Sequence, residues 1–237
     1  MKTMRRILLS AVALLFATGA LAQPAVGTFS ILPHIGVSLA NLPGDKVMVD
    51  AEVPFSAHFK AGFAGGIDLD YQFMRNLSVS LGAYYAQQGC RYENATVEYD
   101  ASGNTVKSYG YSDMSTKLNY LNVPLMLNGY IGPGFAIKVG VQMEFATSGK
   151  LKYTTTPYER NDEGNFVVGS PENHEDNLNK MLRKTNVSIP VGVSYEFSNV
   201  IIDARYNIAL GSAFDKKWDG DTKNRVLMFS AAYRFAL

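Results

Sequence analysis

The sequence predicts an all-β fold, an eight-stranded antiparallel up-and-down transmembrane β-barrel with short periplasmic turns and long extracellular loops. Apolar and polar residues alternate with period two in one segment after another, which is typical of strands with one apolar face. Beyond residue 23 no apolar stretch reaches the roughly 20 residues that a membrane-spanning helix needs. The connections between the alternating segments are short and long in turn, as in barrels that span a membrane.

The first 22 residues have the pattern of a secretory signal peptide. A cationic start precedes an apolar run over 7–17 and a small-residue cleavage signal over 20–22. Because the apolar run is too short to span a bilayer, cleavage is favoured over a membrane anchor. We therefore expect residues 1–22 to be removed and 23–237 to form one barrel domain, exported to the outer membrane of a Gram-negative bacterium.

Eight segments carry the alternation. They are residues 29–40, 60–73, 77–91, 116–131, 135–148, 185–197, 200–211 and 225–237. In the second segment, for example, Ile67, Leu69 and Tyr71 occupy odd positions, whereas Asp68 and Asp70 occupy even ones. Most segments exceed the average strand of about 5–6 residues and reach the roughly 9–11 that a tilted strand needs to cross a bilayer. The even number allows antiparallel neighbours to close a ring.

Three connections are tight, at residues 74–76, 132–134 and 198–199. The other four are long, and they are residues 41–59, 92–115, 149–184 and 212–224. Because long and tight connections alternate strictly, all tight ones fall at one end of the barrel. We expect that end to face the periplasm.

The polar face of the strands combines small residues with charges of both signs, which suits the narrow interior of an eight-stranded barrel. Charges persist in such an interior only if they are paired and hydrogen-bonded. The alternation therefore predicts an ion-pair network that plugs the lumen, together with His34 of the first strand. Its members are Asp68, Asp70, Lys138, Glu144, Glu196, Asp203, Arg205 and Arg234.

Outward-facing aromatic residues gather close to the tight connections. Trp and Tyr are enriched where membrane proteins cross the membrane–water interface, and barrels carry aromatic girdles there. We therefore expect a periplasmic girdle. Its members are Tyr71, Phe73, Phe135, Tyr195, Phe197, Tyr233 and Phe235.

Several motifs resemble one family of small barrels. The segment 119–127, NYLNVPLML, resembles the YLxIPL strand of the PorT-like, or porin-family, outer-membrane β-barrel proteins. The pair 203–207, DARYN, and 232–235, AYRF, is similar to the closing motifs of that family. The resemblance covers the mature chain and implies an outer-membrane location rather than one particular activity.

Composition and motifs exclude several other classes. The 22 basic and 21 acidic residues leave no cationic surplus for binding nucleic acid. Cys90 is the single cysteine, so neither an internal disulfide nor a cysteine-based zinc cluster can form. The three histidines lack ligand spacing, and the acidic segments 162–165 and 215–221 are better interpreted as ordinary turns. No catalytic motif occurs, so we expect neither enzyme activity nor a cofactor or metal.

Function must then reside in the barrel itself or in its long connections. We expect a structural role, or binding and adhesion through the loops, alone or within an envelope or secretion assembly. Its expected partners are outer-membrane lipid, the barrel-insertion machinery and an extracellular protein or glycan. In the longest loop, Leu178, Met181 and Leu182 have helical spacing and predict a short amphipathic turn that caps the barrel mouth. The alternatives are a small channel and a lipid-modifying enzyme.

Aromatic residues in the long connections are candidates for contact with such a ligand, because exposed tyrosine and tryptophan are common in binding surfaces. They are Tyr92, Tyr99, Tyr109, Tyr111, Tyr153, Tyr158 and Trp218.

Overall fold

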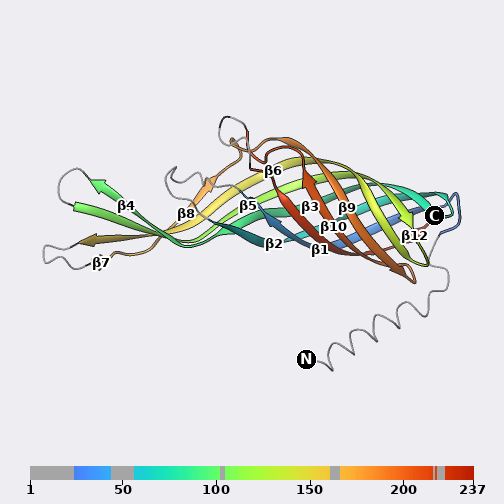
Figure 1. Cartoon of the computed structure of the whole chain (residues 1–237), viewed down its shortest axis with the longest axis horizontal. Helices are drawn as coiled ribbons and strands as arrows, with labels where there is room; N and C mark the ends of the chain where they lie inside the picture. The colour runs from blue at the N-terminus through green and yellow to red at the C-terminus, as the bar shows by residue number, and fades with distance from the viewer. Residues whose placement is uncertain (1–23, 44–55, 102–104, 161–165, 216, 218–221) are drawn as a thin grey trace, which may run out of the picture.

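The structure is a computed structural model that describes residues 24–43, 56–101, 105–160, 166–215, 217 and 222–237. Twelve strands lie in this part of the chain, and Figure 1 shows them as a tilted ring of strands continued by a narrow sheet. Their bounds are β1 Phe29–Asn41, β2 Ala57–Met74, β3 Leu77–Tyr92, β4 Ala95–Ala101, β5 Thr105–Tyr130, β6 Phe135–Arg160, β7 Phe166–Val168, β8 Glu172–Asn177, β9 Thr185–Phe197, β10 Val200–Ala209, β11 Arg225–Tyr233 and β12 Phe235–Ala236. Within these residues no helix has the length and apolar character needed to cross a membrane.

Eight of the strands form a closed antiparallel ring. The order is β1, β2, β3, β5, β6, β9, β10 and β11, and β11 pairs with β1 to close it. The register of the closing pair runs from His34 opposite Ala232 to Asn41 opposite Arg225. Closure leaves none of these eight strands with a free edge along the ring. The predicted eight-stranded antiparallel architecture is therefore confirmed.

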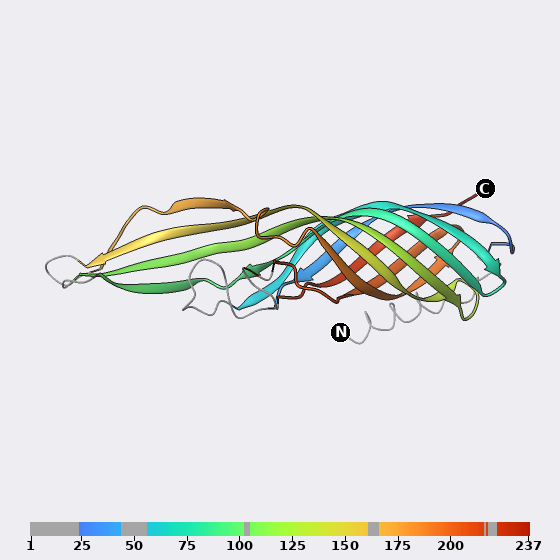
Figure 2. The same ribbon diagram turned by 90° about the horizontal axis from the view of Figure 1, so that it is seen from above.

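The two longest strands extend far beyond the ring. β5 and β6 have 26 residues each, although the alternation predicted strands only over 116–131 and 135–148. Their outer halves pair with each other and with β4, β7 and β8. Together these segments form a narrow sheet that continues the barrel along its long axis, at the left in Figures 1 and 2. We call this sheet the extension. The residues predicted as two long loops are thus largely β-structure, because the hairpins satisfy their backbone hydrogen bonds.

The tight connection between β9 and β10 shows how the sequence sets a barrel corner. Ser198 and Asn199 both adopt positive φ, at 46° and 70°. This conformation at both central positions matches the right-handed twist of a two-residue hairpin. Asn199 suits it because a short polar side chain tolerates the left-handed region.

The apolar side chains of the ring point away from its axis. Val37, Leu69, Leu125 and Val141 are among the exposed ones, whereas the inward positions are mostly polar and buried. This arrangement inverts that of a water-soluble protein, in which large exposed apolar surfaces are rare. The exterior therefore suits hydrocarbon rather than water.

Candidate functional site

One buried arginine joins two carboxylates inside the ring near the tight connections. Arg234, between β11 and β12, donates from Nε to Glu196 Oε1 at 2.7 Å and from Nη2 to Glu196 Oε2 at 2.9 Å. Its Nη1 donates to Asp70 Oδ2 at 3.1 Å, and Nη2 also donates to the Tyr130 hydroxyl at 3.2 Å. The guanidinium therefore binds the Glu196 carboxylate through two hydrogen bonds and the Asp70 carboxylate through one. The bidentate contact is the strongest pairing geometry of an arginine.

Neutral side chains complete the group of lumen residues around Arg234, which we call the Arg234 layer. Ser78 Oγ and Asn128 Nδ2 donate to Asp70 Oδ1 at 2.9 and 3.0 Å. Asn128 Nδ2 also lies 3.0 Å from Ser78 Oγ. Asp70, Ser78 and Asn128 are all buried. The carboxylate of Asp70 thus has partners on both of its oxygens, as a buried charge requires.

A second charged layer lies further along the axis. Lys138 Nζ donates to Asp203 Oδ2 at 2.7 Å, and Arg205 Nε lies 3.5 Å from Asp203 Oδ1. The ring of His34 approaches Asp68, with 3.7 Å between Nδ1 and Oδ2. Gly82 makes room for Asp68, because a Cβ at that glycine would overlap Asp68 Oδ1.

Glu144 lies in the lumen as the alternation predicts, but neutral groups hold it. Its Oε1 accepts hydrogen bonds from Gln142 Nε2 at 2.9 Å and from Ser188 Oγ at 2.7 Å. The same glutamine accepts a bond from the Tyr84 hydroxyl at 2.7 Å. No ion pair to Glu144 occurs among the described residues. Six of the eight predicted charges pair with one another, Asp68 approaches the His34 ring, and Glu144 is held by neutral groups alone.

Several buried polar atoms of the middle layer have no hydrogen-bond partner. They include His34 Nε2, Asp68 Oδ1, Arg205 Nη1, Asn207 Oδ1 and both side-chain polar atoms of Asn122. Buried polar groups of this kind commonly bind ordered water. This layer is therefore less completely paired than the layer around Arg234.

An apolar cluster closes the opposite mouth of the ring. Its buried members are Leu42, Cys90, Tyr111, Met114, Leu118, Tyr120, Leu151, Leu178, Leu182, Ala213 and Phe214. Leu178 and Leu182 come from one turn of chain, in which the Leu182 amide donates to the Leu178 carbonyl at 3.1 Å. The turn predicted from their spacing thus covers the mouth, as a single turn rather than a helix. Phe214 joins it from the β10–β11 connection, and no sequence pattern indicated its role.

The seven aromatic residues of the predicted girdle lie on the outer face, close to the tight connections. None of them is buried. Tyr71 stacks on Phe29 with 4.4 Å between ring centroids, and Tyr233 and Phe235 approach to 4.7 Å. Phe135 and Tyr195 are paired across β6 and β9. They lie on β2, β6, β9, β11 and β12, at the end of the barrel formed by the tight connections.

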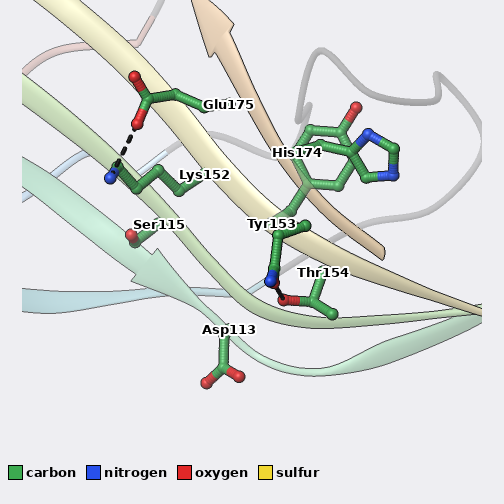
Figure 3. A pocket seen from close by; sticks show the side chains of 8 residues that line it. Asp113, Ser115, Lys152, Tyr153, Thr154, His174 and Glu175 are labelled. Carbon is green, nitrogen blue, oxygen red and sulfur yellow. Dashed lines mark hydrogen bonds and ion pairs between the residues drawn. The ribbon is translucent and has the colours of Figure 1, made fainter. Parts of the chain in front are cut away.

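The extension carries an open polar pocket of about 420 Å³, shown in Figure 3. It is lined by Asp113, Ser115, Lys152, Tyr153, Thr154, Asn173, His174 and Glu175. Glu175 receives hydrogen bonds from Lys150 at 2.5 Å and Lys152 at 2.8 Å, and these bonds lower the pKa of the glutamate to about 2. The Tyr153 ring stacks on His174 with 5.0 Å between ring centroids.

The pocket brings together a serine, a histidine and an aspartate without the geometry of a catalytic triad. His174 Nε2 is hydrogen-bonded to Thr155 Oγ1 at 2.8 Å, and within the described residues no hydrogen bond joins Ser115 to His174. A nucleophile and its base require that bond. In the described part of the chain no group of three His, Cys, Asp or Glu residues could hold a metal ion. The acidic positions Asp219, Asp221 and 162–165, and Trp218, lie outside the described residues.

Comparison with known proteins gives one family. The model of the outer membrane protein beta-barrel domain matches residues 21–215. No curated protein matches.

Solved structures of similar fold include Ail, the attachment invasion locus protein of Yersinia pestis. It is 19% identical over 89% of this chain and 100% of that chain, with a TM-score of 0.43. Neisserial surface protein A is 12% identical over 87% and 97% of the two chains, with a TM-score of 0.36. The Outer Membrane Protein W of E. coli is 17% identical over 89% and 98%, with a TM-score of 0.32.

Proposed function

Because the chain belongs to the outer membrane protein beta-barrel domain family, and is thus an outer-membrane β-barrel, we propose that it is a non-conducting barrel that acts through its extension. The observation that supports this proposal is a cluster of side chains at each end of the lumen. Arg234 binds Glu196 and Asp70 near one end, and the apolar cluster around Leu182 and Phe214 covers the other. An eight-stranded interior is just wide enough for such side chains to fill it.

Planar-bilayer recordings test the closure. We expect the purified, refolded protein to show no steady conductance steps, since neither ion pairs nor an apolar plug leaves a continuous aqueous path. Insertion is verified separately by the heat-dependent gel mobility of the protein recovered from the same vesicles. Steady openings from the inserted protein would contradict the proposal.

A small channel is the second candidate, and one observation favours it. The middle layer contains buried polar atoms without partners, on His34, Asn122, Arg205 and Asn207. Groups of this kind could line a file of water molecules. The same recording separates the two candidates, because a channel requires both closures to open.

The extension supports a role in binding. It carries polar groups beside the stacked rings of Tyr153 and His174, which suits contact with an extracellular protein or glycan. Its proposed place is outside the cell, with the tight connections in the periplasm. The remaining expected partners, outer-membrane lipid and the barrel-insertion machinery, follow from this location, and the narrower PorT-like resemblance stays a prediction.

Cysteine labelling of intact cells tests this orientation. Cys90, the single native cysteine, is 0% exposed, so the wild-type chain should stay unlabelled by a membrane-impermeant maleimide. We expect Val167→Cys on β7 to be labelled in intact cells and Ser198→Cys in the β9–β10 connection only after lysis. The opposite pattern would show that the extension faces the periplasm.

We also propose that the protein is not an enzyme and that residues 1–22 are removed during export. The absence of a bond between Ser115 and His174 supports the first point, since a lipid-modifying hydrolase needs an activated nucleophile. The cationic start and cleavage signal support the second. The mass of the mature chain checks the cleavage site.

A further inference from the structure

The outer face of β3, β5 and β6 changes in chemistry along the barrel axis. Its central part is apolar: Leu81 is paired with Leu125, and Leu125 with Val141. All three side chains are exposed on the outside of the ring. This is the lipid-facing part of the three strands.

A polar band follows toward the extension. Gln87, Asn119 and Ser148 are register neighbours on the three strands. Asn119 Oδ1 accepts from the Tyr85 hydroxyl at 2.8 Å, and Asn119 Nδ2 donates to Ser148 Oγ at 2.7 Å. Gln87 Nε2 lies 3.4 Å from the Tyr85 hydroxyl oxygen. The Tyr85 hydroxyl bonds within this polar band, and tyrosine is typical of the interface between hydrocarbon and water.

Beyond the polar band the outer face is cationic. Lys117 lies directly opposite Lys150, and Arg91 and Lys152 lie on either side of Ser115, the next outward position along β5. We call these four residues the basic band.

The basic band is only partly neutralised by the protein itself. Glu175 binds two members of the band, Lys150 and Lys152. Glu93 binds His58 at 2.8 Å rather than a member of the band. Among the described residues neither Arg91 nor Lys117 forms an ion pair. Like charges opposite one another across a strand pair are destabilising, so Lys117 opposite Lys150 favours an external anion.

The height of the basic band matches that of lipid headgroups. Lys117 lies eight residues from Leu125 along β5. This separation is about 26 Å along the strand and about 20 Å along the membrane normal at a tilt of about 40°. Because half of the hydrocarbon core is about 15 Å thick, the cations lie in the headgroup layer when Leu125 is near the midplane.

We propose that the basic band binds the phosphate groups of a phosphorylated glycolipid of the outer leaflet. The apolar, polar and cationic bands then face the acyl chains, the interfacial groups and the phosphates of the same lipid. The arrangement rests on the proposed orientation, with the extension outside. Such a lipid would hold the barrel at a fixed height below the extension.

Binding to bisphosphorylated lipid A in detergent micelles tests this inference, with the dephosphorylated lipid as the reference ligand. We expect the wild type to prefer the phosphorylated form. The double variant Lys117→Gln/Lys150→Gln should bind it about fivefold to tenfold more weakly, because it removes two of the four cations of the basic band and exposed ion pairs contribute modestly. The matched variant Lys217→Gln/Lys223→Gln removes the same charge from the β10–β11 connection and should bind like the wild type.

Two outcomes overturn the inference. One is equal affinity of the Lys117/Lys150 variant and the wild type, with folding of both verified by heat-dependent gel mobility. The other is tighter binding of a soluble sulfated glycan, such as a heparin oligosaccharide, through the same two lysines, which would assign the basic band to a glycan. Binding in detergent micelles depends neither on the orientation of the protein in a membrane nor on its conductance. These results are therefore independent of those that test the proposed function.

Discussion

Replacing Arg234 with Met should lower the free energy of unfolding by about 3–5 kcal/mol, the cost of leaving a buried charge without its partner. Glu196 and Asp70 are 3% and 2% exposed, and among the described residues both form their ion pairs with this one guanidinium. Met keeps much of the volume of the side chain, so the loss comes mainly from the uncompensated carboxylates. Urea-induced unfolding in phospholipid vesicles, followed by circular dichroism, measures the change.

Two further variants make this experiment specific. Arg75→Met removes an exposed arginine from the tight connection at the same end of the barrel and should change stability by less than about 0.5 kcal/mol. The triple change of Asp70→Asn, Glu196→Gln and Arg234→Met removes the whole charged group and should recover part of the loss, because neutral partners cost less to bury. A loss below about 1 kcal/mol for the single variant would show that these charges do not hold the barrel closed.

The sequence predicted which residues face the lumen more reliably than how they pair. Within one strand the side-chain period is two, so the apolar face places Asp70, Glu196 and Arg234 inward without reference to any other strand. Pairing depends on register between strands far apart in the chain, which alternation does not contain. Glu144 illustrates the difference, since it faces inward as predicted but binds Gln142 and Ser188 rather than a cation.

The extension was missed for a physical reason. Alternation reveals a strand only where one face is apolar at every second position. In the outer half of β5, Tyr111 and Met114 are both buried although they have opposite parity, because the register shifts between Ser112 and Ser115. A β-bulge also shifts the inward and outward alternation of β6 by one residue. Asn119 pairs with Ser148 and Tyr120 with Ala146, so Thr147 is an extra residue in β6. Beyond it Leu151 turns inward, and Lys150 and Lys152 turn outward. Lys150 and Lys152 therefore join the basic band because of a bulge that no local pattern indicated.

Replacing Val141 with Arg should lower the free energy of unfolding in vesicles by about 2–4 kcal/mol, the cost of a cation near the bilayer midplane. Val167→Arg on β7 is the matched control, and its expected cost is below about 0.5 kcal/mol. The two valines are 55% and 51% exposed, so exposure alone predicts equal effects.

Only the surrounding solvent distinguishes the two positions. Val141 pairs with Leu125 in the apolar band of the ring, whereas Val167 pairs with Glu159 in the extension above it. In water an arginine at either position extends into solvent at little cost. In a membrane the arginine at 141 must either lose its hydration or draw water and headgroups into the hydrocarbon, while the arginine at 167 remains hydrated. Equal costs at the two positions would therefore contradict a lipid-facing exterior, and with it the interpretation of the inward charges as a plug.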